Sequence, residues 1–101
     1  MIIITGSVQL YEDARELALA LGCEHSARSR AEEGCVSHNC YIDAEDANRM
    51  HFLEQWRDMA AVQKHFAVPE SGGFIREVSA MAAAAPEIAI YAAEEVEGAP
   101  F

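Results

Sequence analysis

Two histidines stand in stretches that are otherwise mainly apolar, and a histidine can do acid–base chemistry near neutral pH. His38 lies in an alternating stretch, 35–43, and His65 lies beside Phe66 in a stretch with helical spacing. An unperturbed imidazole has a pKa of about 6.5, so it can accept the proton of a phenol and hold it during an electron transfer. Either residue is therefore a candidate base. Each histidine also has a purely structural interpretation. His65 would be a helix residue hydrogen-bonded to the edge of the sheet, and His38 would only take the place of another polar side chain in the strand.

Glu54 is the acidic residue with the most unusual position. It stands in the alternating stretch 49–56, on the side that otherwise carries apolar residues. A buried carboxylate carries a desolvation penalty unless it is paired. Glu54 could therefore orient His38 or act as a base itself, whereas a salt bridge with Arg49 or Arg76 would make it structural.

Three further residues could bind a substrate. Trp56 offers a flat surface and an indole N–H donor to a planar aromatic molecule, although a tryptophan that only anchors the core would look the same. Phe52 lies four residues earlier, on the same side of the stretch. Arg76 could hold a substrate oxyanion, but a lone arginine on a helix is usually solvated or ion-paired.

The spacing of the candidate ligands disfavours a metal site. His38 with Glu54 would supply only two ligands, too few for a structural zinc ion. The three cysteines show neither CxxC spacing nor a Cys/His zinc pattern and are expected to be reduced thiols: Cys23, Cys35 and Cys40. We therefore expect no metal and no cofactor.

The elements that position these side chains follow from hydrophobic periodicity. The predicted strands are 1–10, 35–43, 49–56 and 88–96, and the predicted helices are 12–33, 58–67 and 74–84. Gly34 ends the first helix, Asp58 caps the second, and residues 69–73 break the chain. This order is that of a ferredoxin-like split βαβ fold, an α+β fold with helices on one face of an antiparallel sheet.

Strand register decides whether His38 meets Glu54. If even positions of 35–43 pair with even positions of 49–56, both side chains lie in one apolar wall, and an odd register would separate them. With the even register, the wall comprises Val36, Cys40, Ile42, Met50, Phe52 and Trp56.

The other face of the predicted sheet has no cover. Cys35, Tyr41 and Leu53 fall on it, and they are too apolar to be left in water as one patch. A second copy of the chain is the expected cover, which predicts a homodimer. His51 is assigned to this dimer side and His25 to the surface, both without a role.

Composition limits the classes of protein to be considered. The 101 residues, 51% of them hydrophobic, suit one domain over 1–101. A formal charge of −10 repels phosphate backbones and anionic lipids, so neither nucleic acid nor a membrane is an expected partner. No run approaches the roughly 18 apolar residues of a membrane helix, and the N-terminal residues lack the pattern of a signal peptide. A cytoplasmic protein is expected.

Five segments of the chain form a recognisable set. They are Glu33-Gly34-Cys35, Tyr41-Ile42-Asp43, Asp46-Ala47-Asn48-Arg49, Glu54-Gln55-Trp56-Arg57-Asp58 and Ala61-Val62-Gln63-Lys64-His65-Phe66. Together they resemble the antibiotic biosynthesis monooxygenase family, including its quinol-monooxygenase-like branch, and the resemblance runs from Ile2 to Val96. It implies a dimeric α/β barrel in which each subunit has one pocket between its sheet and its helices.

The resemblance also implies a chemistry: a cofactor-independent monooxygenase that oxidises a small aromatic quinol or polyketide-like substrate with dioxygen. The catalytic residues would be His65 and Glu54, and the substrate would be bound by Trp56, His38, Phe52 and Arg76. An alternative is a non-catalytic dimeric module that binds a small molecule. Haem degradation is less favoured, because the family's haem enzymes use an asparagine in the first strand and residues 1–10 contain none. Some polyketide oxygenases have asparagine at the position of Phe52, so their chemistry does not transfer directly.

Overall fold

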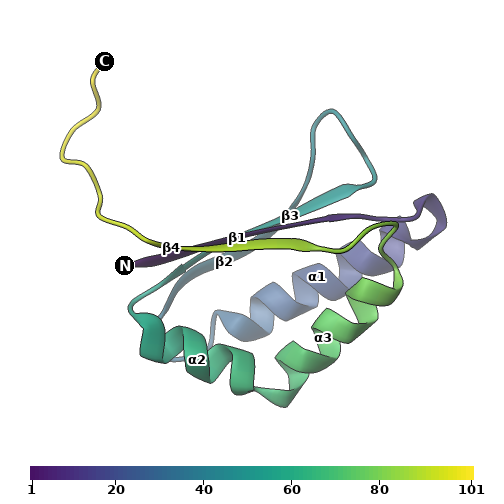
Figure 1. The fold of residues 1–101 in the computed structure, drawn as a ribbon, viewed down its shortest axis with the longest axis horizontal. Coiled ribbons are helices and arrows are strands. Elements are labelled where there is room, and N and C mark those ends of the chain that lie inside the picture. Colours follow the sequence, from purple (N-terminus) through teal and green to yellow (C-terminus); the bar gives the residue numbers. More distant parts are fainter.

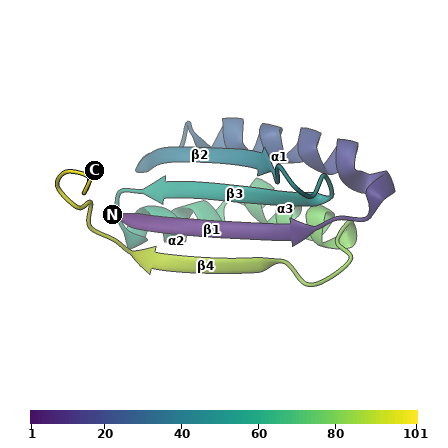
Figure 2. The same cartoon turned by 90° about the horizontal axis from the view of Figure 1, so that it is seen from above.

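The computed structural model describes residues 1–101 and shows a four-stranded antiparallel sheet with helices on one face. In chain order the elements are β1 (Ile2–Gln9), the 3-10 helix η1 (Glu12–Ala14), α1 (Arg15–Ser29), β2 (Cys35–Ile42), β3 (Arg49–Trp56), α2 (Met59–Ala67), α3 (Pro69–Ala80) and β4 (Glu87–Ala92). The strand order is β2-β3-β1-β4. All three α-helices lie on the same side of the sheet (Figure 1), and the opposite face is open (Figure 2). The predicted ferredoxin-like α+β fold is confirmed.

Of the two registers left open by the sequence, the structure has the even one between β2 and β3. His38 pairs with Glu54, and Cys40 pairs with Phe52. On the other side of β3, Glu54 pairs with Ile4 of β1. Because directly opposite residues of paired strands point to the same face, His38 and Glu54 project side by side toward the helices.

A β-bulge at the start of β2 overturns two predictions. The register shifts between Cys35 and Ser37, so that Cys35 pairs with Trp56. The extra residue reverses the alternation at this point. Cys35 consequently packs against the core and does not lie on the open face, and Val36 is 60% exposed and does not join the apolar wall.

The first helix is shorter than the predicted 12–33. η1 precedes α1, and turn residues separate its end from β2. Gly34 closes this connection with φ 86°, the left-handed conformation predicted for it. Gly22 sits in the middle of α1 because the helix lies close to the sheet: a Cβ there would come within 2.8 Å of Sγ of Cys40.

The predicted break over 69–73 is wrong, because α3 begins at Pro69. Proline lacks an N–H, and the first position of a helix does not need one. The backbone N–H of Ser71 then donates to the carbonyl of Val68 at 3.0 Å, which starts the helical hydrogen bonding. The glycines that follow are therefore part of the helix, which ends at Ala80.

Two apolar clusters join the helices to the sheet. One comprises Ile2, Ile4, Trp56, Ala61 and Val62, and the other comprises Val8, Leu10, Ala18, Met50 and Val78. Neither contains a histidine or Glu54. None of the helices is long and apolar enough to cross a bilayer. β4 ends at Ala92, before the predicted Val96.

Candidate active site

A cavity of about 570 Å³ lies between the sheet and the helices. Its wall is largely apolar, with residues from β3, α2, α3 and β4: Phe52, Phe66, Phe74, Ile75, Val78, Ile88 and Ile90. The polar side chains that line it include His25, Glu54 and His65. The volume falls in the range typical of small-molecule sites, about 300–1,000 Å³.

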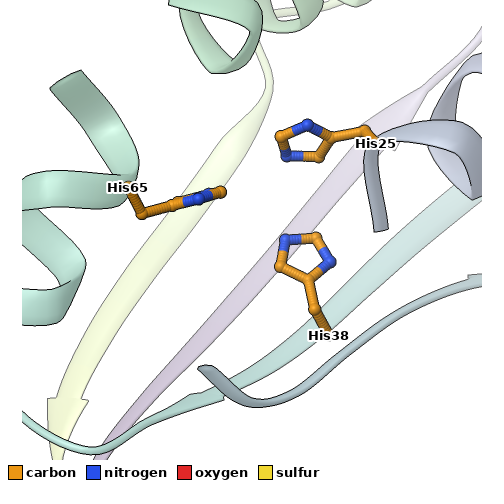
Figure 3. A group of neighbouring side chains, drawn as sticks. All are labelled: His25, His38 and His65. Carbon is orange, nitrogen blue, oxygen red and sulfur yellow. The ribbon is translucent and has the colours of Figure 1, made fainter. Parts of the chain in front are cut away.

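Three histidines from different elements come together at this cavity. His25 comes from α1, His38 from β2 and His65 from α2, and their rings face one another (Figure 3). The ring centroid of His38 lies 5.0 Å from that of His25 and 5.6 Å from that of His65. All three side chains are buried, and so is Glu54. These four residues are called the histidine cluster below.

His65 is held in one orientation by Glu32. Its Nδ1 lies 3.0 Å from Oε2 of Glu32 and 3.1 Å from Oε1. A carboxylate only accepts hydrogen bonds, so Nδ1 carries a proton, and in the neutral ring Nε2 has the lone pair. Nε2 lies 3.9 Å from Oε1 of Glu54, on the cavity side. The arrangement is that of an oriented general base.

Glu54 is anchored by the residue two positions along β3. The indole N–H of Trp56 donates to Oε1 of Glu54 at 2.9 Å, and Nε2 of His38 lies 3.4 Å from the same oxygen. Burial raises the pKa of the Glu54 carboxyl, and the hydrogen bond from Trp56 opposes that rise. The salt bridge to Arg49 or Arg76 considered for Glu54 is not formed.

His38 and His25 are neutral at physiological pH. Burial, reinforced by the neighbouring His25 and His65, lowers the pKa of His38 to about 3. Its Nδ1 contacts the hydroxyl of Ser26 at 2.8 Å, whereas its Nε2 is buried without a hydrogen-bond partner. Burial, with smaller contributions from His65 and Arg28, lowers the pKa of His25 to about 4.

The surface position predicted for His25 is wrong. Arg28 donates to Nδ1 of His25 at 2.7 Å, and the His25 ring stacks on Phe74 with centroids 4.2 Å apart. Leu17 lies on the exposed face of α1 and is itself 57% exposed, so the large apolar residues of this helix do not mark its buried face. The buried face was visible in the small and polar residues three and four apart: Ala18, Gly22, His25, Ser26 and Ser29.

The structure brings some of the predicted site residues together and not others. His65, Glu54 and Phe52 line the cavity. Trp56 and His38 are fully buried behind this wall and reach it through Glu54. Arg76 is exposed on α3 and does not line the cavity. Glu32 was not predicted as a site residue, because no local pattern links it to a histidine 33 residues away.

Comparisons with known proteins agree with this architecture. The family described as antibiotic biosynthesis monooxygenase matches residues 1–77. The uncharacterized protein sll1783 of Synechocystis sp. is 32% identical over 96 residues, which are 95% of this chain and 65% of that protein. The present chain thus spans about two thirds of the length of this relative.

Two solved structures share the fold. A protein from Deinococcus radiodurans that carries the provisional name antibiotic biosynthesis monooxygenase superposes with a TM-score of 0.92 at 20% identity, covering 98% of each chain. Rv0793 from Mycobacterium tuberculosis superposes with a TM-score of 0.87 at 21% identity, covering 96% of this chain and 98% of its own. At these identities, the likeness to the two structures supports the fold and no statement about activity. The family match over most of the sequence goes further, and the chain belongs to the antibiotic biosynthesis monooxygenase family.

Proposed function

We propose that this protein is a cofactor-independent monooxygenase that oxidises a small aromatic quinol or polyketide-like substrate with dioxygen. The observation that carries the proposal is the Glu32–His65 pair at the wall of an apolar cavity. Family membership supports oxygen chemistry. The quinol-monooxygenase-like branch is part of the proposal, because its substrates donate their own electrons to dioxygen.

The reaction begins with a proton transfer to His65. Nε2 accepts the phenolic proton, and the Glu32 carboxylate at Nδ1 stabilises the imidazolium that forms. The quinolate then passes one electron to dioxygen, and the resulting radical pair joins to form a carbon–oxygen bond. His65 returns its proton to the outer oxygen of the peroxide. The oxygenated ring carbon then loses its hydrogen as a proton, the electron pair of that C–H bond forms the new carbonyl as the O–O bond breaks, and the departing hydroxide takes up this proton and leaves as water. For a quinol with a free ring position, quinol and dioxygen give hydroxyquinone and water.

The cavity suits a substrate of one or two fused aromatic rings. Phe52 and Phe74 offer flat apolar surfaces, and Ile75 closes the wall on α3. Exclusion of water by this lining favours electron transfer over loss of the intermediate to solvent. Glu54, whose pKa burial raises, faces the substrate beside His65 and can hydrogen-bond its second oxygen.

The proposal includes a homodimer formed through the open face of the sheet. Three large side chains project there from three strands: Tyr41, Leu53 and Tyr91 are 49%, 41% and 53% exposed. Packing them against a second copy would remove this apolar patch from water. We also propose one domain over 1–101 and a cytoplasmic location, for which the three free cysteines are suited.

Oxygen consumption tests the proposal directly. The purified protein is given a panel of hydroquinones, naphthoquinols and anthrones without flavin or metal, and the uptake rate is compared among wild type, His65→Ala and His51→Ala. We expect uptake above autoxidation that is lost in His65→Ala. His51→Ala is the matched control, because His51 lies on the open face and contacts Asp43.

Two other results would change the proposed function or the residue proposed as its base. If no compound in the panel is consumed and His65→Ala still binds the aromatic ligands with wild-type affinity, the chain is a non-catalytic binding module. If uptake is equal in wild type and His65→Ala, the protein is an oxygenase whose base is another residue.

A further inference from the structure

The histidine cluster carries more ligand atoms than a single base requires. His25, His38 and His65 each direct one ring nitrogen toward a shared space, and these nitrogens lie within 4.8 Å of one another (Figure 3). They come from two helices and a strand, so the whole fold is needed to assemble them. Oxidation of a quinol needs one proton acceptor, and His65 alone supplies it.

A buried ring nitrogen without a hydrogen-bond partner is the second observation that points to a ligand at this cluster. Nε2 of His38 is buried and has no hydrogen-bond partner, although Oε1 of Glu54 lies 3.4 Å away. Leaving a buried polar atom unpaired costs about 1–3 kcal/mol. A bound cation at the centre of the cluster would satisfy both Nε2 of His38 and the carboxylate of Glu54.

The outer contacts of two rings are those found around metal-bound histidines. Glu32 accepts from Nδ1 of His65, and the hydroxyl of Ser26 contacts Nδ1 of His38 at 2.8 Å. The carboxylate fixes the tautomer of His65, and the Ser26 hydroxyl can accept from Nδ1–H of His38, which leaves Nε2 of that ring for the metal.

We propose that His25, His38 and His65, with Glu54 as a fourth ligand, bind a divalent transition-metal cation such as Zn²⁺ or Co²⁺. Three imidazole nitrogens and one carboxylate select such ions over Ca²⁺ and Mg²⁺, which prefer oxygen ligands. Zinc–nitrogen bonds of about 2.0–2.1 Å bring ligand nitrogens closer together than 4.8 Å, the limit within which all three lie here, so we expect the rings to close around the ion.

Arg28 opposes the binding of a cation. Its guanidinium donates to Nδ1 of His25 at 2.7 Å, which assigns the proton of that ring to Nε2. Metal binding through Nε2 of His25 requires this contact to be released. Arg28 also lies 3.6 Å from Glu32 and is partly exposed, so it has an alternative position. We therefore expect the contact between Arg28 and His25 to lower the affinity of the site for a cation.

The metal site has a consequence that rests on the proposed function. A cation on Nε2 of His65 occupies the lone pair that accepts the substrate proton. The metal-loaded protein should therefore have lost the cofactor-free oxygenase activity, and a chelator should restore it. Binding itself does not depend on that activity.

Calorimetry with Zn²⁺ tests the site without any substrate. The full chain, freed of metal by a chelator and then dialysed, is titrated with Zn²⁺, and Co²⁺ is added separately to record its visible absorption. We expect one ion per chain and the intense d–d bands of four-coordinate Co²⁺. His25→Ala, His38→Gln and His65→Ala should each weaken Zn²⁺ binding by at least about tenfold, comparable with the loss of a ligand's support. His51→Ala, the remaining histidine, should bind as wild type.

A variant outside the ligand set guards against misfolding of the cluster variants. Arg28→Met should bind Zn²⁺ more tightly than wild type, because His25 no longer has a competing donor at Nδ1. Absence of stoichiometric binding, binding lost in His51→Ala but kept in the cluster variants, or weaker binding in Arg28→Met would overturn the proposal. Zinc binding without quinol oxidation would leave the site standing and remove only the proposed function.

Discussion

The carboxylate of Glu32, at the end of the first helical region, accepts a hydrogen bond from Nδ1 of His65 on α2 at 3.0 Å. The contact joins residues 33 positions apart and leaves Nε2 of His65 free beside the cavity. It converts a helix histidine into an oriented base. Each of the following predictions depends on this site or on the sheet that supports it.

Replacement of Glu32 by glutamine should lower kcat with little change in KM. An amide no longer stabilises the imidazolium, and it can present its N–H₂ to Nδ1 and favour the wrong tautomer. Since a positioned base contributes about 10²–10⁴-fold, we expect kcat to fall by at least about tenfold, with a shifted pH profile of kcat. Steady-state kinetics from pH 5 to 9 will check this. An unchanged pH profile and kcat would show that Glu32 does not act through His65.

Loss of the indole N–H at position 56 should destabilise the charged form of Glu54. In Trp56→Phe the carboxylate loses its 2.9 Å donor, so its pKa should rise further. A hydrogen bond to a charged group contributes about 1.5–3 kcal/mol. The ring change also costs packing energy, but that part does not vary with pH. Urea unfolding at pH 5 and pH 8 should show the larger loss at pH 8, and equal losses would refute the effect on Glu54.

The buried histidines should make the fold less stable as the pH falls below 6.5. The folded-state pKa values, about 4 for His25 and about 3 for His38, lie below the unfolded value. The unfolded chain therefore binds more protons, and stability present above pH 6.5 is lost as the pH falls toward the folded values. Each histidine contributes up to about 1.4 kcal/mol per pH unit.

Urea unfolding from pH 7.5 to 5 in the presence of a chelator will measure this slope. The raised pKa of Glu54 acts with the opposite sign, so the comparison with a variant is needed. His38→Gln should show a shallower slope than wild type. An identical slope in the two proteins would mean that His38 is not buried in its neutral form.

A charge on the open face of the sheet should dissociate the proposed homodimer. Leu53 is 41% exposed at the centre of that face, and Leu53→Glu would place two carboxylates in an apolar interface. Sedimentation should show a dimer for wild type and a monomer for the variant. The matched control is Leu17→Glu, a change to an exposed leucine on α1 that should remain dimeric. A wild-type monomer, or a Leu53→Glu dimer, would contradict the proposed interface.

The strands and their pairing could be predicted because their pattern is local and repetitive. The alternation in 35–43 and 49–56 predicted both strands and the face of each side chain, but it left two registers open, and the structure has the one that places His38 opposite Glu54. The bulge between Cys35 and Ser37 could not be predicted, because a bulge changes how the residues of a strand pair and leaves no mark in which residues the strand contains. The start of α3 at Pro69 was missed because proline and glycine signal a break unless they fall in a first turn.

Only some residues of the candidate site could be predicted from the sequence. Glu54, His65 and Phe52 were found because they interrupt or extend an apolar pattern, and the structure places them on the cavity wall. His25 and Glu32 come from the region of α1 and its end, where polar residues are unremarkable, and only tertiary packing shows that they face inward. The convergence of three histidines could not be predicted, because His25 was assigned to the surface and only His38 and Glu54 were considered as metal ligands.

The central claim is that the protein inserts one atom of dioxygen into an aromatic substrate with His65 as the base. The most direct measurement is mass spectrometry of the product after turnover under ¹⁸O₂, with the quinol that gives the fastest oxygen uptake and with chelator present. We expect one ¹⁸O atom in the product, the second in water, and no labelled product from His65→Ala. A product without ¹⁸O, or labelling that persists undiminished in His65→Ala, would contradict it.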